Sequence, residues 1–272
     1  MELNKNLDDW DTIKFASSKA ELKPTLDHRK FDVDKLELLL VGDLHLGSRF
    51  FDEDMVKQMI RHSLTKKAPI ILMGDSIETA TRDSVGAGVY EQSEIIDEQV
   101  AHFVHLFKPL AKENLILGIH AGNHELRLFR SSGLDITKTI LAKELKIPYF
   151  SCSKLHYLRV GKEKYRLYTT HGSSGARLPY TKIKGVLDLA NIVEAEIYAM
   201  GHLHQLSHHI RNYYSIDVKN KKVIEEQKHF ILTGSFLNYW GSYANIKNYE
   251  PSRKGYPKVK LSGLEHQIRV SL

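Results

Sequence analysis

Carboxylate, amide and imidazole side chains follow five apolar runs of the sequence, at the point where each run ends. The runs end in Gly42-Asp43-Leu44-His45, Gly74-Asp75, Gly122-Asn123-His124-Glu125, Thr169-Thr170-His171-Gly172 and Gly201-His202-Leu203-His204. The donors in these segments are oxygens or imidazole nitrogens, and none is a thiolate. Such a set favours a site for manganese, iron or zinc and argues against a structural zinc finger.

Eight donors exceed what one ion needs. They suit two ions that share a bridging carboxylate at roughly 3.5–4 Å, the arrangement that holds the attacking and leaving oxygens of a phosphoryl displacement. Each segment alone has an ordinary alternative, because Gly-Asp is most often a turn and a lone Asp-x-His seldom binds metal. Their joint occurrence favours a metal site.

The apolar runs predict the strands that position these donors. Strands are expected at 36–41, 69–73, 115–119, 164–170 and 196–200, and helical spacing predicts helices over 52–66, 91–108, 134–146 and 181–192. Residues 155–160 and 164–170 form a predicted hairpin around Gly161-Lys162, and antiparallel strands are expected after about residue 208. This order indicates an α/β sandwich, in which ligands gather at the carboxyl ends of the strands.

The composition excludes several classes of protein. The chain has 272 residues, of which 42% are hydrophobic and 26% charged, so it is neither disordered nor of low complexity. Its apolar runs are far shorter than the ~20 residues of a membrane helix, and no signal peptide is visible. The single cysteine, Cys152, cannot form an internal disulfide, which fits a reducing compartment. We therefore expect a soluble, cytoplasmic protein with no membrane partner.

The polar first 35 residues predict an N-terminal extension packed on the core, and residues 36–272 predict one domain. The net charge of +6 favours anionic partners. The segment from Phe236 to Tyr243 contains Tyr239 and Trp240, which either stack on a nucleic-acid base or simply pack in a strand.

The ordered blocks Asp43-x-His45, Gly74-Asp75, Gly122-Asn123-His124-Glu125, His171 and Gly201-His202-x-His204 resemble the calcineurin-like metallophosphoesterase superfamily. The resemblance covers about residues 38–205. It implies a four-layer α/β/β/α sandwich of two mixed sheets flanked by helices, with the metal site at the carboxyl ends of the strands. The N-terminal 35 and C-terminal 65 or so residues carry no matching motif.

The resemblance also implies the roles of individual residues. One ion would be held by Asp43, His45, Asp75 and His204, and a second by Asp75, Asn123, His171 and His202. Two divalent ions per chain are expected, with manganese first and iron, zinc or cobalt as alternatives.

His124 would stand over the scissile phosphate without binding metal. Glu78 occupies the position where the related protein phosphatases have an aspartate, so we expect it to orient His124; the alternative is a solvated loop residue. Those phosphatases have an arginine next, where this chain has Thr79. Arg82, Arg127 and Arg177 are candidates to contact the substrate instead.

The leading hypothesis is a phosphoesterase that uses a metal-bridging hydroxide to hydrolyse a phosphodiester in nucleic acid or a nucleotide, as a compact nuclease or phosphodiesterase. A phosphomonoesterase, such as a protein phosphatase, is the alternative. A scaffold of the same fold without catalysis is the third hypothesis, and it is disfavoured because all the ligand positions are intact.

Overall fold

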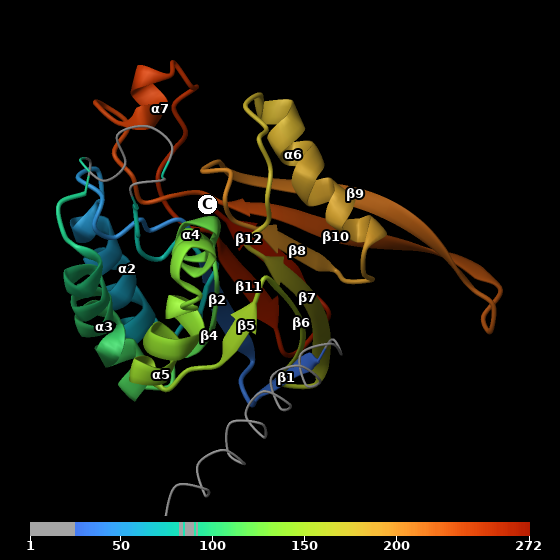
Figure 1. Ribbon diagram of the computed structural model, residues 1–272. Helices are drawn as coiled ribbons and strands as arrows, with labels where there is room; N and C mark the ends of the chain where they lie inside the picture. Colours follow the sequence, from blue (N-terminus) through green and yellow to red (C-terminus); the bar gives the residue numbers. More distant parts are fainter. Residues whose placement is uncertain (1–24, 82–83, 85–89, 91) are drawn as a thin grey trace, which may run out of the picture.

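Two six-stranded mixed sheets pack face to face in the computed structural model, which describes residues 25–81, 84, 90 and 92–272 (Figure 1). Helices cover the outer face of each sheet, so the expected four-layer α/β/β/α sandwich is confirmed.

The first sheet contains the three strands that lead into the Asp43, Asp75 and Asn123 segments. Its strand order is β12-β11-β2-β3-β4-β5. The strands β2, β3, β4 and β5 run parallel, so their carboxyl ends meet at one edge. The bounds are β2 (Lys35–Val41), β3 (Ile70–Leu72), β4 (Ile116–His120), β5 (Tyr149–Ser151), β11 (Lys258–Ser262) and β12 (Ile268–Ser271).

The second sheet supplies the remaining histidines. Its order is β1-β6-β7-β8-β10-β9, and β7, β8 and β10 run parallel to one another. The predicted hairpin around Gly161 is present as β6 and β7. The bounds are β1 (Leu26–Phe31), β6 (Ser153–Val160), β7 (Glu163–Thr170), β8 (Ile197–Met200), β9 (Leu206–Asp217) and β10 (Lys222–Thr233).

Helices on the first sheet are α2 (Glu53–Lys66), α3 (Ile96–Lys112), α4 (Asn123–Ser132), η2 (Thr137–Leu141) and α5 (Ala142–Leu145). Those on the second are α6 (Pro179–Leu187) and η3 (Asp188–Asn191), and α7 (Tyr243–Ile246) lies in the segment after β10. Helix α2 begins where the Asp52 carboxylate accepts a hydrogen bond from the Met55 N–H at 3.0 Å.

Three apolar clusters hold these layers together. The central one joins residues of the first sheet, such as Leu38 and Ile71, to residues of the second, such as Leu167 and Ile197. A second cluster lies between the first sheet and α2 and α3, and a third between the second sheet and α6. Each fully buried aliphatic side chain contributes about 1.5–3 kcal/mol to folding.

Some sequence predictions differ from the structure. Residues 1–24 of the predicted extension lie outside the described residues, and Leu26–Phe31 are not packed on the sheet but form an edge strand within it, parallel to β6. Charged residues are common in an edge strand, and this one has no apolar run to reveal it. Helix α3 also continues past Pro109 to Lys112.

Within the part of the chain that the structure describes, no helix is both long enough and apolar enough to cross a membrane.

Candidate metal centre

The five segments converge on one site at the edge where the carboxyl ends of both sheets meet. Asp43 and His45 follow β2, Asp75 follows β3, and Asn123 begins α4 directly after β4. His171 follows β7, and His202 and His204 follow β8. Residues up to 161 positions apart in the sequence are therefore brought together by parallel strand pairing.

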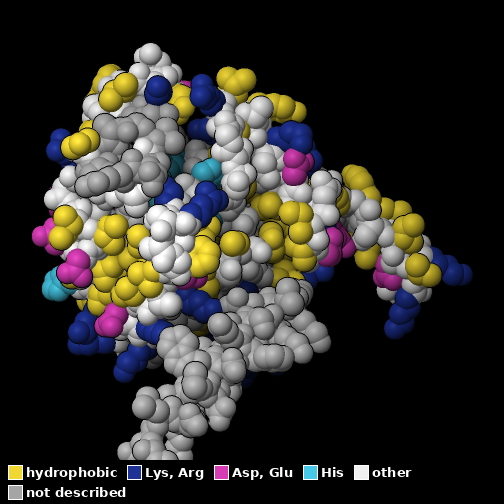
Figure 2. All heavy atoms as spheres, viewed as in Figure 1, with side chains coloured by type: hydrophobic (Ala, Val, Ile, Leu, Met, Phe, Trp, Pro, Cys, Tyr) yellow, Lys and Arg dark blue, Asp and Glu magenta, His cyan; other side chains and the backbone are white. Residues whose placement is uncertain are grey.

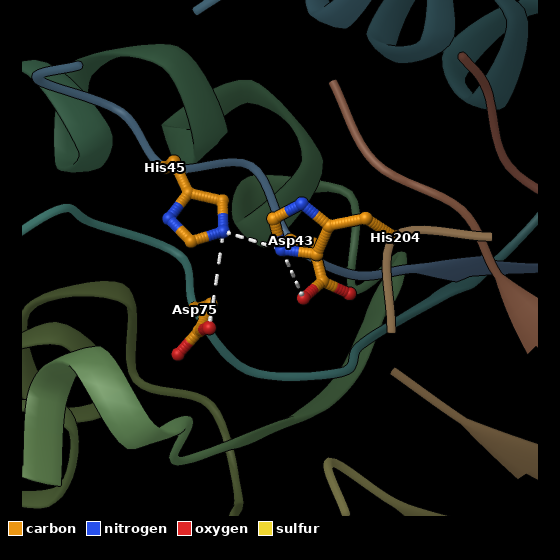
Figure 3. Close-up of side chains that lie close together, drawn as sticks. All are labelled: Asp43, His45, Asp75 and His204. Atoms are coloured by element: carbon orange, nitrogen blue, oxygen red, sulfur yellow. Dashed lines mark hydrogen bonds and ion pairs between the residues drawn. The ribbon is translucent and has the colours of Figure 1, made fainter. Parts of the chain in front are cut away.

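One group of donors comprises Asp43, His45, Asp75 and His204 (Figure 3). The His45 Nε2 atom lies 3.0 Å from His204 Nε2 and 3.8 Å from Asp75 Oδ2. The His204 Nε2 atom lies 3.3 Å from Asp43 Oδ1. One ligand atom from each of the four lies within 4.8 Å of the others, a separation that a single cation can span.

A second group shares Asp75 with the first and adds His171 and His202. The His171 Nε2 atom lies 3.4 Å from Asp75 Oδ2. The Asn123 Oδ1 atom completes the group, 2.9 Å from His171 Nε2 and 2.7 Å from His202 Nδ1. Asp75 is therefore common to both groups.

The second group brings lone pairs together. The His171 Nδ1–H donates to the Met73 carbonyl at 2.9 Å, and the His202 Nε2–H donates to the Ser174 carbonyl at 3.0 Å. In the neutral rings this leaves the other two nitrogens as acceptors, facing the Asn123 oxygen and the Asp75 carboxylate. Four converging acceptors repel one another unless a proton or a metal ion lies between them, so the donor set fits a metal ion.

The electrostatics of the site also favour a cation. Burial alone would raise the pKa of Asp75, but the neighbouring His124 and His171 hold it well below the ordinary value. Burial would lower the pKa of His171, but the Asp75 charge raises it to about 10. The buried carboxylates thus attract positive charge strongly, and a bound metal ion would supply it.

Five of the predicted ligands have backbone conformations in the left-handed region. The φ angles are 54° at Asp43, 52° at His45, 49° at Asp75, 67° at His202 and 51° at His204. A non-glycine residue in this conformation costs about 1–2 kcal/mol, and such strain concentrates at functional sites.

Glu78 contacts both His124 and His45. Its Oε1 atom lies 3.2 Å from His124 Nδ1, whose N–H also faces the Glu78 carbonyl at 3.0 Å. Its Oε2 atom accepts a hydrogen bond from His45 Nδ1 at 2.9 Å. Burial favours the neutral form of His124, but Asp75 and Glu78 raise its pKa to about 9. The structure therefore places His124 beside Glu78, with its Nε2 3.9 Å from Asp75 Oδ2.

Sequence reasoning missed the role of Glu125. This buried carboxylate accepts hydrogen bonds from the backbone N–H groups of Asp75, Ser76, Ile77 and Gly122 at 2.6–3.2 Å. It ties the turn after β3 to the start of α4. A glutamate three residues after a glycine was the available signal, because it is the position of an N-terminal helix cap.

Thr79, where the phosphatases have arginine, is buried and donates its hydroxyl to the His124 carbonyl at 2.6 Å. Arg127 lies one turn after His124 on α4 and donates to the Ser84 hydroxyl at 3.1 Å. Arg177 stacks on the Tyr249 ring at 5.5 Å, and Arg82 lies outside the described residues. The two described arginines therefore contact different segments of the chain.

The segments of all five blocks meet at one buried site. The structure thus brings together the blocks on which the resemblance to the calcineurin-like metallophosphoesterases rests. No family model matches the chain, and no curated protein matches it.

Among solved structures, the chain is similar to a conserved protein of Streptococcus pneumoniae described as a predicted phosphoesterase, with 15% identity and a TM-score of 0.39 over 87% of this chain and 88% of that one. It is also similar to a Thermotoga maritima protein, with 14% identity and a TM-score of 0.32 over 87% of this chain and 98% of that one.

Proposed function

We propose that this protein is a metal-dependent phosphoesterase with two divalent ions, manganese first among them, and that its substrate is a phosphodiester in nucleic acid or a nucleotide. The observation that carries the proposal is the position of Asp75, a buried carboxylate shared by two groups of converging donors next to His124.

The first ion would be held by Asp43, His45, Asp75 and His204, and the second by Asp75, Asn123, His171 and His202. Bound ions in such a site neutralise charge on the phosphoryl group and make water nucleophilic near neutral pH. The carbonyls of Met73 and Ser174 fix the ring orientations of His171 and His202, which prepares the donors before an ion binds.

His124 is the candidate proton donor. Glu78 holds its Nδ1, so Nε2 faces the site and carries the transferable proton of the imidazolium. That proton passes to the leaving oxygen of the substrate, and Glu78 stabilises the imidazolium beforehand. Cations bound at Asp75 would offset the effect of the Asp75 charge on the pKa of His124. The Glu78 charge is then what keeps the proton on His124.

The preference for a diester is supported by charge and by exposed aromatic groups. The net charge is +6, which favours an anionic polymer or nucleotide. Thr79 stands at the position where phosphomonoesterases of the protein-phosphatase type have an arginine. The Phe236 N–H donates to the Asp43 carbonyl at 3.1 Å, so the segment that carries Trp240 begins beside the site. Trp240 is 81% exposed and contacts Tyr239 edge to face, which leaves its ring free to stack on a base.

The test compares hydrolysis by metal-stripped protein reconstituted with manganese, using bis-p-nitrophenyl phosphate, p-nitrophenyl phosphate, single- and double-stranded DNA, RNA and cyclic nucleotides. His124→Ala should lower kcat by about 10²–10⁴-fold while the bound metal is retained. His105→Ala, an exposed histidine on α3, is the matched control and should keep full activity.

Faster turnover of the diester than of the monoester would support the proposal. Preference for p-nitrophenyl phosphate would favour the phosphomonoesterase. Full metal loading with no turnover of any substrate would favour the scaffold.

A further inference from the structure

The hairpin of β9 and β10 extends beyond the rest of its sheet (Figure 1). We call its outer part, residues 210–224, the arm. Along β9 the residues nearest the body, Leu206 to His209, are half-buried, and exposure rises beyond them. Within the described residues, no second layer covers the outer part of this strand pair.

The arm exposes the apolar residues Val223 and Ile224 on β10 and three further apolar side chains on β9. Ile210, Tyr214 and Ile216 lie on one face of this strand because their numbers differ by even steps. Tyr214 is 73% exposed and Ile216 77%. Across the hairpin from Tyr214 and Asn212 stand the polar residues Glu225 and Gln227. Figure 2 shows hydrophobic side chains along the arm and basic ones at its tip.

β9 is also an edge strand. Within the described sheet it pairs only with β10, so one row of its backbone groups faces outward. Such an edge, long and partly apolar, is a template for another strand. The tip of the arm carries three basic residues, Lys219, Lys221 and Lys222. The charged residues on the outer part of β9 itself are Arg211 and Asp217.

We infer that the protein forms a two-fold symmetric dimer in which the β9 strands of two copies pair antiparallel and join their sheets. A two-fold axis perpendicular to the sheet keeps even-numbered residues on one face, so Ile210, Tyr214 and Ile216 of both copies gather on the same side. Pairing of the two β9 strands satisfies the outward-facing backbone groups of both edges. It also brings the apolar residues of the two copies into contact with one another.

Charge complementarity selects the register. With the axis at Tyr214, Arg211 of one copy stands opposite Asp217 of the other, twice by symmetry. Axes at Asn212, Tyr213 or Ser215 instead place Arg211 opposite Tyr213, Ser215 or Lys219. Arg211 stands opposite Lys228 across its own hairpin, and Lys228 pairs with Glu194 at 2.8 Å, so the residue that faces Arg211 within the hairpin is a cation and not a carboxylate. Asp217 accepts hydrogen bonds from Asn220 and retains lone pairs for an arginine.

The register also places Ile210 opposite Val218, and the two Tyr214 rings opposite each other. One strand pair with a few apolar side chains buries less than the ~1,600 Å² of a standard interface, so we expect micromolar association. The catalytic groups follow β2, β3, β4, β7 and β8 and contribute nothing to this edge.

Sedimentation velocity of the full chain over a range of concentrations tests the dimer. The wild type should shift from monomer to dimer, and Ile216→Lys should remain a monomer. Asp54→Lys, an exposed substitution on α2, is the control for added positive charge. A wild type that stays monomeric up to millimolar concentration, or an Ile216→Lys dimer as strong as the wild type, would overturn the inference.

Charge reversal tests the register. Arg211→Asp and Asp217→Arg should each weaken the dimer about fivefold or more, and the double variant should recover most of the loss. In a Cys152→Ser background, Tyr214→Cys should oxidise to a disulfide dimer, because opposite Cα atoms lie about 4.5–5.5 Å apart. Glu225→Cys, on the inner strand, should not. Additive losses in the double variant and equal crosslinking at both positions would exclude this pairing.

Discussion

The Glu78 carboxylate lies 3.2 Å from the Nδ1 atom of His124, and the Glu78 carbonyl lies 3.0 Å from the same atom. One residue therefore fixes the imidazole twice, through its backbone and through its side chain. Only the side-chain contact depends on charge, so the two effects can be separated by an isosteric substitution.

Glu78→Gln should lower kcat and move the alkaline limb of the pH–rate profile to lower pH. The limb falls where His124 loses its proton, and the Glu78 charge raises the pKa of His124 toward about 9. Without that charge the proton is lost at lower pH. Steady-state kinetics of the variant across this pH range provide the measurement, with bound manganese determined in parallel. A lower kcat with an unmoved limb would contradict the assignment.

Asp75→Asn should reduce the bound manganese from two ions per chain and lower kcat by at least about a hundredfold, because a neutral amide cannot bridge two cations. Metal content by mass spectrometry after desalting checks the first effect. Asp54→Asn, an exposed carboxylate on α2, provides the matched control. Retention of both ions by Asp75→Asn would show that this residue is not the bridge.

Gly122→Ala should disrupt the site, whereas Gly175→Ala should be tolerated. A methyl group on Gly122 would stand 2.1 Å from both the Asp75 nitrogen and Oδ1, while one on Gly175 meets nothing within 4 Å. Moving Asp75 would disturb both donor groups. Thermal unfolding and manganese binding of the two variants should differ accordingly, and equal binding would contradict the close approach.

Stability should fall with acidification through the titration of His120. Burial lowers the pKa of this imidazole from 6.5 to about 3 in the folded protein, with further effects from His156 and His171. The unfolded chain therefore binds the proton first, and stability is lost as pH falls below 6.5.

By about pH 5 the loss should reach about 2 kcal/mol, at 1.4 kcal/mol per unit. Urea unfolding of the wild type and His120→Gln at neutral and acidic pH measures the two slopes. The variant should be less stable at neutral pH but should lose less on acidification. His105→Gln, exposed on α3, should keep the wild-type slope.

Most residues of the candidate site could be predicted from local sequence, because each donor follows an apolar strand within a few residues. Neither the pair Asp43 and His45 nor the pair His202 and His204 indicates a metal site by its spacing alone, but the five blocks together do. The sequence predicted these strands but not their order, and the parallel pairing of β3 with both β2 and β4 is what brings the donors together.

Two features depended on tertiary contacts that the sequence does not display. Helix α4 was missed because Asn123–Ser132 is largely polar, with Leu126, Leu128 and Phe129 as its apolar residues. What begins the helix is the Gly122 N–H donating to Glu125, whose carboxylate also binds the turn after β3. Strand β1 was missed because only pairing with β6 makes Leu26–Phe31 extended.

The left-handed backbone at five of the proposed metal ligands sets stability against activity. At His45, φ is 52°, a conformation in which glycine would relieve the strain that the imidazole residue imposes. Selection for heat resistance alone would therefore replace ligands with glycine and yield a sturdier, inert protein. Laboratory evolution of this protein for thermal stability therefore needs a simultaneous screen for turnover. Without it, the most stable variants selected will be inactive ones.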